Sequence, residues 1–114
     1  MNKKMSTARY AIKIADEDLT KNVDLTAVDF NRRYCLERVL KSTDGAVTVD
    51  LSVVGTQSLL YLETSAPITV GLNDGATFVV TSVLFMTEGM DIVSIQNLDS
   101  LVDATVKLYA YGSV

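Results

Sequence analysis

The chain has 114 residues, of which 48% are hydrophobic and 21% charged, and its formal net charge at pH 7 is −4. This length and composition are typical of a single globular domain and exclude a disordered chain. Because it has one cysteine and no histidine, the sequence excludes an internal disulfide, a zinc site built from thiolates and a histidine general base.

Charge is distributed unevenly along the chain. Residues 1–45 contain nine basic and seven acidic side chains, whereas residues 46–114 contain one basic residue, Lys107, against seven acidic ones. This division indicates an acidic body with a mildly basic attachment segment, or an acidic surface that simply favours solubility. Phosphate repels an acidic chain, so we expect no nucleic-acid partner.

The start of the chain is mildly basic, but the apolar segment of a signal peptide does not follow it. The longest nearly apolar run, residues 78–86, is far shorter than the ~20 residues that a membrane-spanning helix requires. We therefore expect a protein made in the cytoplasm, without a signal peptide and without a membrane partner.

Residues 1–30 are expected to form a first strand and an irregular arm. After a frayed terminus over residues 1–8, the alternation in residues 10–15 is typical of a strand. Residues 16–29 begin with three acidic side chains and continue with scattered apolar ones. We interpret this segment as a loop or a short irregular arm.

Oxygen-bearing side chains recur at alternate positions of this segment, as the ligands of a calcium-binding loop do. They are Asp16, Asp18, Thr20, Asn22 and Asp24. The segment departs from a calcium loop at two positions. Lys21 stands where the tight turn requires glycine, and Ala27 stands where a bidentate glutamate is required.

Residues 30–42 fit either an amphipathic helix or a strand, and a strand is favoured because the segment lies among other strands and has no N-cap box. Cys35, in its apolar stripe, is expected to be a small core residue. The same segment contains a basic cluster, interpreted as a docking patch for an acidic protein surface or as a solvated face. The cluster consists of Arg32, Arg33, Arg38 and Lys41.

From residue 46 onward, β-branched residues are frequent and turn signals recur at short intervals. The expected strands cover residues 47–53, 58–63, 68–72, 76–86, 91–96 and 104–111. This spacing predicts an all-β fold, an antiparallel β-sandwich of jelly-roll type. We expect one domain over residues 1–114, with residues 31–114 as the sandwich body.

Residues 68–86 predict a hairpin whose turn, Asn73–Gly75, has glycine in the position that needs a left-handed residue. The second strand of this hairpin is apolar on both faces, so its own domain or a partner chain must cover both. The outer residues of the last strand include two tyrosines, which either cover the end of a barrel or contact a partner. The predicted interface is Val79, Val83, Phe85, Tyr109 and Tyr111.

Catalytic side chains are scarce. Five carboxylates lie at the ends of predicted strands, where two could act together in glycoside hydrolysis, but acids at such positions are normally solvated. They are Glu63, Glu88, Asp91, Asp99 and Asp103. We expect no catalytic residue, no metal ligand and no cofactor, and hence a protein that is not an enzyme.

Three segments resemble small structural proteins of tailed bacteriophages: Leu60–Gly75, Asp91–Asn97 and Asp103–Gly112. The resemblance implies a β-sandwich that assembles on the virion as a decoration, cement or fibre-base component. It also implies a homo-oligomer, most often a trimer, that binds the major capsid protein or another virion protein.

Two hypotheses follow from the sequence. The first is a non-enzymatic virion protein that oligomerises through an apolar strand face and docks through its basic segment. The alternative is a β-sandwich module that binds a small molecule or carbohydrate, with or without calcium.

Overall fold

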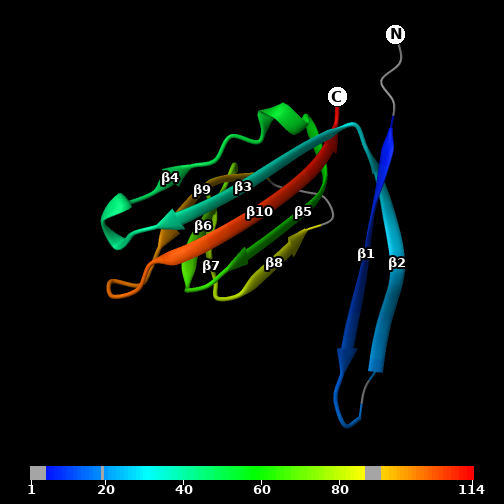
Figure 1. Ribbon diagram of the computed structural model, residues 1–114, viewed down its shortest axis with the longest axis horizontal. Helices are drawn as coiled ribbons and strands as arrows, with labels where there is room; N and C mark the ends of the chain where they lie inside the picture. The colour runs from blue at the N-terminus through cyan, green and yellow to red at the C-terminus, as the bar shows by residue number, and fades with distance from the viewer. Residues whose placement is uncertain (1–4, 19, 87–90) are drawn as a thin grey trace.

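The computed structural model describes residues 5–18, 20–86 and 91–114, with the backbone alone for residues 21–26 (Figure 1). Within this part of the chain the fold is all-β, as predicted, and consists of two packed antiparallel sheets and a separate two-stranded arm. Its helical turns, over Ser42–Asp44 and Ser52–Val54, have three residues each. Across the described residues, no helix has the length and apolarity that a membrane crossing requires.

Each of the two sheets has four strands. The first sheet has the order β3 (Arg32–Leu40), β10 (Ala104–Ser113), β5 (Thr56–Thr64) and β8 (Val83–Met86). The second sheet has the order β4 (Val47–Thr48), β9 (Ile92–Asn97), β6 (Ile68–Leu72) and β7 (Thr77–Val80). Figure 1 shows the second sheet packed behind the first, which gives the two layers of a sandwich.

The core lies between the two sheets and follows from the alternation of each strand. In β10, Ala104, Val106, Leu108 and Ala110 are completely buried, as predicted for the inner positions of the last strand. Their neighbours in the core include Leu60 and Leu62 of β5, Ile68 and Val70 of β6, and Ile92 and Ile95 of β9. Complete burial of each Leu, Ile or Val side chain contributes roughly 1.5–3 kcal/mol to stability before the ordering cost is subtracted.

The predicted hairpin turn is confirmed, but its second strand is divided between the sheets. The Leu72 amide donates to the Ala76 carbonyl at 2.9 Å, and Gly75 has a φ of 90°. Residues 77–80 pair with β6 in the second sheet, whereas residues 83–86 pair with β5 in the first. The chain therefore crosses from one sheet to the other at residues 81–82, and one parity of the segment faces the core in both sheets.

The strand expected over residues 47–53 ends at Thr48, so that prediction is wrong beyond this point. Asp50 Oδ1 accepts a hydrogen bond from the Ser52 amide at 3.0 Å, and the Val54 amide then donates to the Leu51 carbonyl at 3.1 Å. An aspartate side chain that bonds the backbone two residues ahead competes with strand pairing. The alternating apolar residues Val49 and Leu51 are buried all the same.

The segment left between helix and strand forms β3, so the preferred prediction is confirmed. Cys35, however, is exposed rather than a core residue. In register with Tyr109, it lies on the face of β3 that points away from the other sheet. The even positions of β3, among them Leu36 and Leu40, are the ones that contact the core.

The N-terminal arm is a hairpin with a register shift between Tyr10 and Ile12, which corrects the expectation of a loop over residues 16–29. Strand β1 (Ser6–Ala15) pairs antiparallel with β2 (Thr20–Phe30), and the strand begins within the segment expected to be frayed. The polar residues of β2 include Thr20 and Thr26, and β-branched side chains favour an extended backbone whatever their polarity. The connecting loop contains a local turn, in which the Asp18 amide donates to Asp16 Oδ1 at 2.8 Å.

Two buried amide side chains provide a test of the core. Asn97 and Gln57 are each 6% exposed. Asn97 Nδ2 donates to the carbonyls of Leu40 and Val102 at 2.9 Å each, and its Oδ1 accepts from the Asp99 amide at 2.8 Å. Among the described residues, both side-chain polar atoms of Gln57 lack a hydrogen-bond partner.

We predict that Asn97→Leu lowers the free energy of unfolding by about 2 kcal/mol or more, because it leaves three backbone groups without their partner. Gln57→Met should change it by less than about 1 kcal/mol or raise it, since no bond to the protein is lost. Urea unfolding of the two variants measures both values. Equal losses of stability would contradict this account of the two amides.

Candidate interaction surface

The outer face of the first sheet carries a row of aromatic side chains. Cys35, Tyr109, Tyr61 and Phe85 are successive cross-strand partners in β3, β10, β5 and β8. The side chains of directly opposite residues lie on the same side of a sheet, about 4.5–5.5 Å apart at Cβ. The register therefore builds a continuous aromatic row across the face that points away from the core.

The base of the arm covers part of this row. Phe30, at the end of β2, packs edge-on against Tyr111 with ring centroids 4.8 Å apart and an interplanar angle of 72°. Tyr10 of β1 packs against Phe85 with centroids 4.7 Å apart. Such ring pairs each contribute about 0.5–1.5 kcal/mol beyond their buried area. The arm is thus attached to β10 at one point and to β8 at the other.

A cavity of about 210 Å³ lies between the arm and the sheet. Aromatic rings from both sides line it, and Leu59 and Arg9 are also in its wall. Leu59, in register with Tyr111, is 4% exposed although it lies on the outer face of β5. The arm therefore excludes water from a part of the sheet outside the sandwich core.

The electrostatics of the aromatic row centre on Tyr61. Its hydroxyl donates to Glu63 Oε2 at 3.2 Å. Burial raises the pKa of Tyr61, and the hydrogen bond to Glu63 and the negative charges of Glu63 and Tyr109 raise it further. Lys107 is the cross-strand partner of both Glu37 and Glu63. Glu37, Lys107 and Glu63 therefore form a second row beside the aromatic one, in which neighbouring charges alternate in sign.

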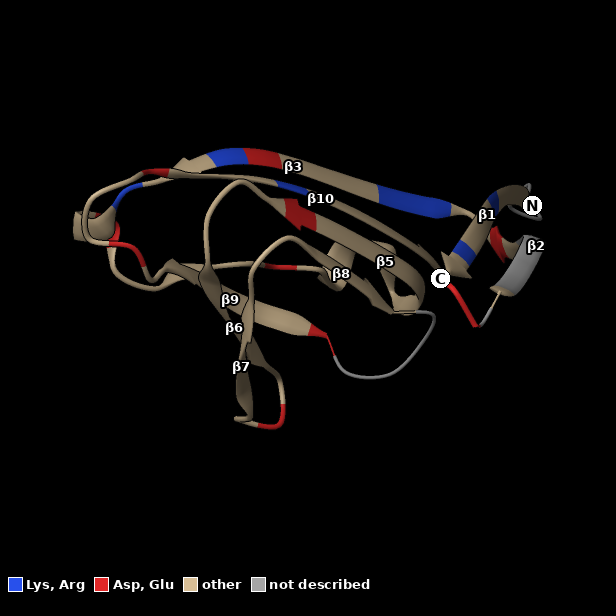
Figure 2. Cartoon of the chain, turned by 90° about the horizontal axis from the view of Figure 1, so that it is seen from below, with Lys and Arg blue, Asp and Glu red and all other residues tan. Residues whose placement is uncertain are grey.

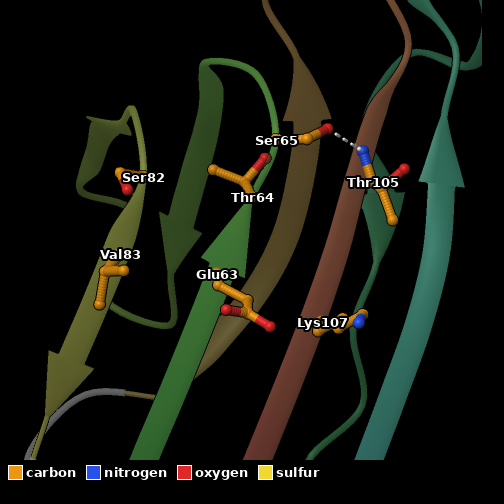
Figure 3. Close-up of a pocket in the computed structure, with 7 residues that line it drawn as sticks. All are labelled: Glu63, Thr64, Ser65, Ser82, Val83, Thr105 and Lys107. Carbon is orange, nitrogen blue, oxygen red and sulfur yellow. Dashed lines mark hydrogen bonds between the residues drawn. The ribbon is translucent and has the colours of Figure 1, made fainter.

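A second, open hollow of about 310 Å³ lies beside the same face, near the far end of β5 (Figure 3). Its wall contains Glu63, Ser65 and Lys107 with other short polar side chains. The Thr105 amide donates to Ser65 Oγ at 2.8 Å, which fixes the rim between β5 and β10. A polar hollow of this kind is able to hydrogen-bond a small polar ligand.

The predicted interface residues divide between the two outer faces of the sandwich. Phe85, Tyr109 and Tyr111 lie on the outer face of the first sheet together with Val83, which is 54% exposed. Val79 lies on β7 in the second sheet and is 56% exposed. Four of the five residues therefore share one surface. Val79 is separated from them because the chain changes sheets after Val80.

The basic cluster follows the edge strand β3, and Figure 2 shows its blue segments along that strand. Strand alternation places Arg33 on the outer face, in register with Tyr111, and places Arg32 and Arg38 on the opposite parity. Arg38 and Lys41 also lie at the other end of the strand from Arg32 and Arg33. Five strand residues correspond to ~17 Å, so the cluster is an extended basic edge rather than a compact patch.

Sequence reasoning missed three aromatic members of this surface: Tyr10, Phe30 and Tyr61. Tyr61 belongs to a segment with apolar residues on both parities, and its neighbours Leu60 and Leu62 are the ones that face the core. Alternation within residues 59–63 places Tyr61 on the face opposite Leu60 and Leu62, and this was the signal that could have identified it. The contacts of Tyr10 and Phe30 depend on how the arm folds back, and this is not encoded in a local pattern.

The described acidic residues do not gather into a metal centre, since no group of three or more Cys, Asp or Glu side chains is close enough to hold an ion. The backbone from Thr20 onward is a paired strand, so it does not coil around a centre as a calcium loop does. The candidate carboxylates have separate surroundings. Asp99 Oδ1 accepts the amides of Leu101 and Val102 in a loop, and Glu88 lies outside the described residues.

Comparison of the chain with protein-family models, curated protein sequences and solved structures found no match. The fold and the surface described above are therefore the basis of the functional proposal.

We predict that Tyr10→Ala releases the arm without unfolding the sandwich, because it removes the ring contact with Phe85 and leaves the core unchanged. Hydrogen exchange of the β1 and β2 amides should become faster, while exchange in β10 is unaffected. Val79→Ala, on the other sheet, is the matched control and should leave the arm unchanged. Equal exchange of the arm in both variants would show that Tyr10 does not hold it.

The raised pKa of Tyr61 predicts a dependence of stability on alkaline pH. An unfolded tyrosine loses its proton near pH 10, whereas folded Tyr61 loses it at higher pH. The contribution of Tyr61 to stability is therefore complete below pH ~10 and declines as the pH rises through the folded pKa. The stability difference between the wild type and Tyr61→Phe should shrink over this range.

Glu63→Gln removes the charge that adds to the effect of burial, so it should bring the Tyr61 pKa part of the way back. Ultraviolet titration of the phenols, with Tyr61→Phe as the reference that identifies this residue, measures the shift. An unchanged titration in Glu63→Gln would contradict the assignment to Glu63.

Proposed function

We propose that the protein is a non-enzymatic structural component of a tailed-phage particle, which forms a homo-oligomer and docks on a larger virion surface. The single observation that carries this proposal is the projecting arm. Of its described side chains, from Met5 to Asp18, at Thr20 and from 27 to 30, none is buried. An isolated two-stranded hairpin has marginal stability in water. An arm of this length would gain stability when another surface covers it.

The arm exposes apolar side chains beyond its contacts with the sandwich. Ile12 and Ile14 are 39% and 55% exposed, and they have the same parity as Tyr10, which packs on Phe85. Their apolar surface continues the surface that the arm buries at its base. Val83 adds an exposed apolar side chain at the neighbouring edge of the sheet. Exposed apolar residues grouped in this way are typical of an interaction surface.

The resemblance to small virion proteins of tailed phages supplies the class of assembly. A sandwich body with an extended arm and a basic edge supports it, because such a body can contact copies of itself and an acidic surface at the same time. The partly exposed aromatic side chains and the exposed arginines are of the types enriched at protein interfaces. Oligomerisation as a trimer and binding to a capsid or tail protein belong to this proposal.

The polar hollow around Glu63, Ser65 and Lys107 favours a second candidate, a module that binds a small polar molecule or a carbohydrate. Tyr61 and Tyr109 lie in the next row of the same face, with ring centroids 6.2 Å apart, and could stack on a sugar. A module of this kind does not need the projecting arm, so the virion proposal explains more of the structure.

We predict that the purified protein is an oligomer at micromolar concentration and sediments with intact particles of the phage that encodes it. Light scattering gives the mass, and immunoelectron microscopy locates the protein on the particle. The flanking genes should encode capsid, portal or tail proteins. A monomer that is absent from particles, and whose melting temperature rises with an oligosaccharide, would favour the second candidate.

A further inference from the structure

The arm runs across the outer face of the first sheet, from β10 towards the edge strand β8. Its base contacts β10 through Phe30 and Tyr111, and its middle contacts the edge strand β8 through Tyr10 and Phe85. Beyond Tyr10 the arm passes the edge of the sheet, and Figure 1 shows its tip below the sandwich. From Ala11 to Asp18 every side chain is exposed. The outer half of the arm therefore lies beyond β8, away from the β3 edge.

The outer half of the arm has one apolar face and an acidic tip. A register shift separates Tyr10 from Ile12, with the extra residue in β2, so β1 keeps its own alternation and Ile12 and Ile14 have the parity of Tyr10. The loop at the tip contributes Asp16, Glu17 and Asp18. A surface that covers this half should therefore be apolar in part and positively charged at its far end.

The β3 edge of the same molecule has these properties. Val39, on the outer face of β3, is 50% exposed, and the exposed Cys35 lies on the same face. The exposed basic residues Arg38 and Lys41 lie on either side of Val39 in the sequence, and β3 is an edge of its sheet. Glu37, on the same outer face, is the cross-strand partner of Lys107. Strand β3 lies at the opposite end of the sheet from β8, so the arm of one molecule leads away from its own β3.

We propose that the outer half of the arm binds across the β3 edge of a second copy of this chain. The apolar face of Ile12 and Ile14 packs on the outer face of β3 near Val39. The acidic tip pairs with the basic residues at that end of the strand, Arg38 and Lys41. This contact rests on the proposed homo-oligomer and specifies how its copies meet. Each copy gives its arm to one neighbour and its β3 edge to another, so the contact is heterologous and forms a ring when the rotation between copies closes.

Charge reversal tests the electrostatic half of this contact. Glu17→Lys with Asp18→Lys changes the tip, and Arg38→Glu with Lys41→Glu changes the edge, while all four side chains are exposed and should not be needed for folding. Each double variant should weaken association by about tenfold or more. In an equimolar mixture, contacts between unlike chains should return, because a reversed tip then meets a reversed edge and a native tip meets a native edge. Dimers and even-numbered species should form, whereas a closed trimer still contains one repulsive contact between like chains.

Sedimentation velocity measures the mass, and circular dichroism confirms that each variant is folded. If the wild type is an oligomer and both variants keep its mass, this arm contact is wrong while the proposed oligomer remains. If the wild type is a monomer at micromolar concentration, the proposed oligomer and this contact are both wrong.

Disulfide trapping tests the apolar half. In a Cys35→Ser background, Ile14→Cys and Val39→Cys should form disulfides between chains. A bond within one chain is excluded because three strand spacings of ~4.8 Å separate β3 from β8, whereas a disulfide requires Cα atoms about 4.4–6.8 Å apart. Partial oxidation should give dimers and larger species on a non-reducing gel.

The matched control replaces Val39→Cys by Val79→Cys, which is equally exposed but lies on the other sheet. This pair should not cross-link. Equal cross-linking of the two pairs, or none in either, would overturn the proposed contact, and a product that stops at the dimer would overturn the head-to-tail arrangement.

Discussion

The alternation of strand β10 between two environments is the constraint on which the rest of the structure depends. Its inner residues are completely buried between the sheets, and its outer residues carry Tyr109 and Tyr111 to the opposite face. The strand pairs on both sides, with β3 and with β5, so its register is fixed along nearly its whole length. A slip of one residue would exchange the two faces. Core and interaction surface are therefore specified by the same strand.

The arm is the part of the fold that the core does not explain. Among the described residues, the strands of the arm pair only with each other. The ring contacts of Tyr10 and Phe30 join the arm to the sheet. These contacts lie in its inner half. Two aromatic pairs of about 1 kcal/mol each are small beside the entropy of ordering two long strands. The lone subunit therefore stabilises the arm weakly, and an added surface on Ile12 and Ile14 would contribute a large share.

Much of the sandwich could be predicted from the sequence, because burial on one face imposes a period of two. This period identified β10 and β6. The turn at Gly75 was predicted from its glycine, and β3 from its position among strands and the lack of an N-cap box. The period failed where a side chain competed with the backbone, as Asp50 does after β4. It also failed for β2, whose strand is polar and has its partner in β1 rather than in the core. A period of two in the sequence arises when one face of a strand is buried. The arm lies outside the core and buries few side chains, so it shows this period only weakly.

The surface was harder to predict than the core for a related reason. Tyr109 and Tyr111 could be assigned to the outer face from alternation alone, since the inner residues of their strand are uniformly apolar. Val79 and Val83 have the same parity in one apolar run, yet they lie on opposite faces of the sandwich. The crossing at residues 81–82 separates them, and its only local signal is a pair of small polar residues, Thr81 and Ser82. Which apolar residues form one surface is decided by the path of the chain between sheets.

Copies of an acidic chain repel one another, which limits how they can associate. At a net charge of −4 per chain, a contact between two acidic faces would be opposed at low salt. The basic side chains of residues 32–41 lie on one edge, so this edge offers the acidic surface of another copy a favourable electrostatic contact. A two-fold contact of this edge with itself would bring like charges together. An acidic tip that meets a basic edge avoids the conflict, and this favours a tip-to-edge contact over a dimer in which the two basic edges meet.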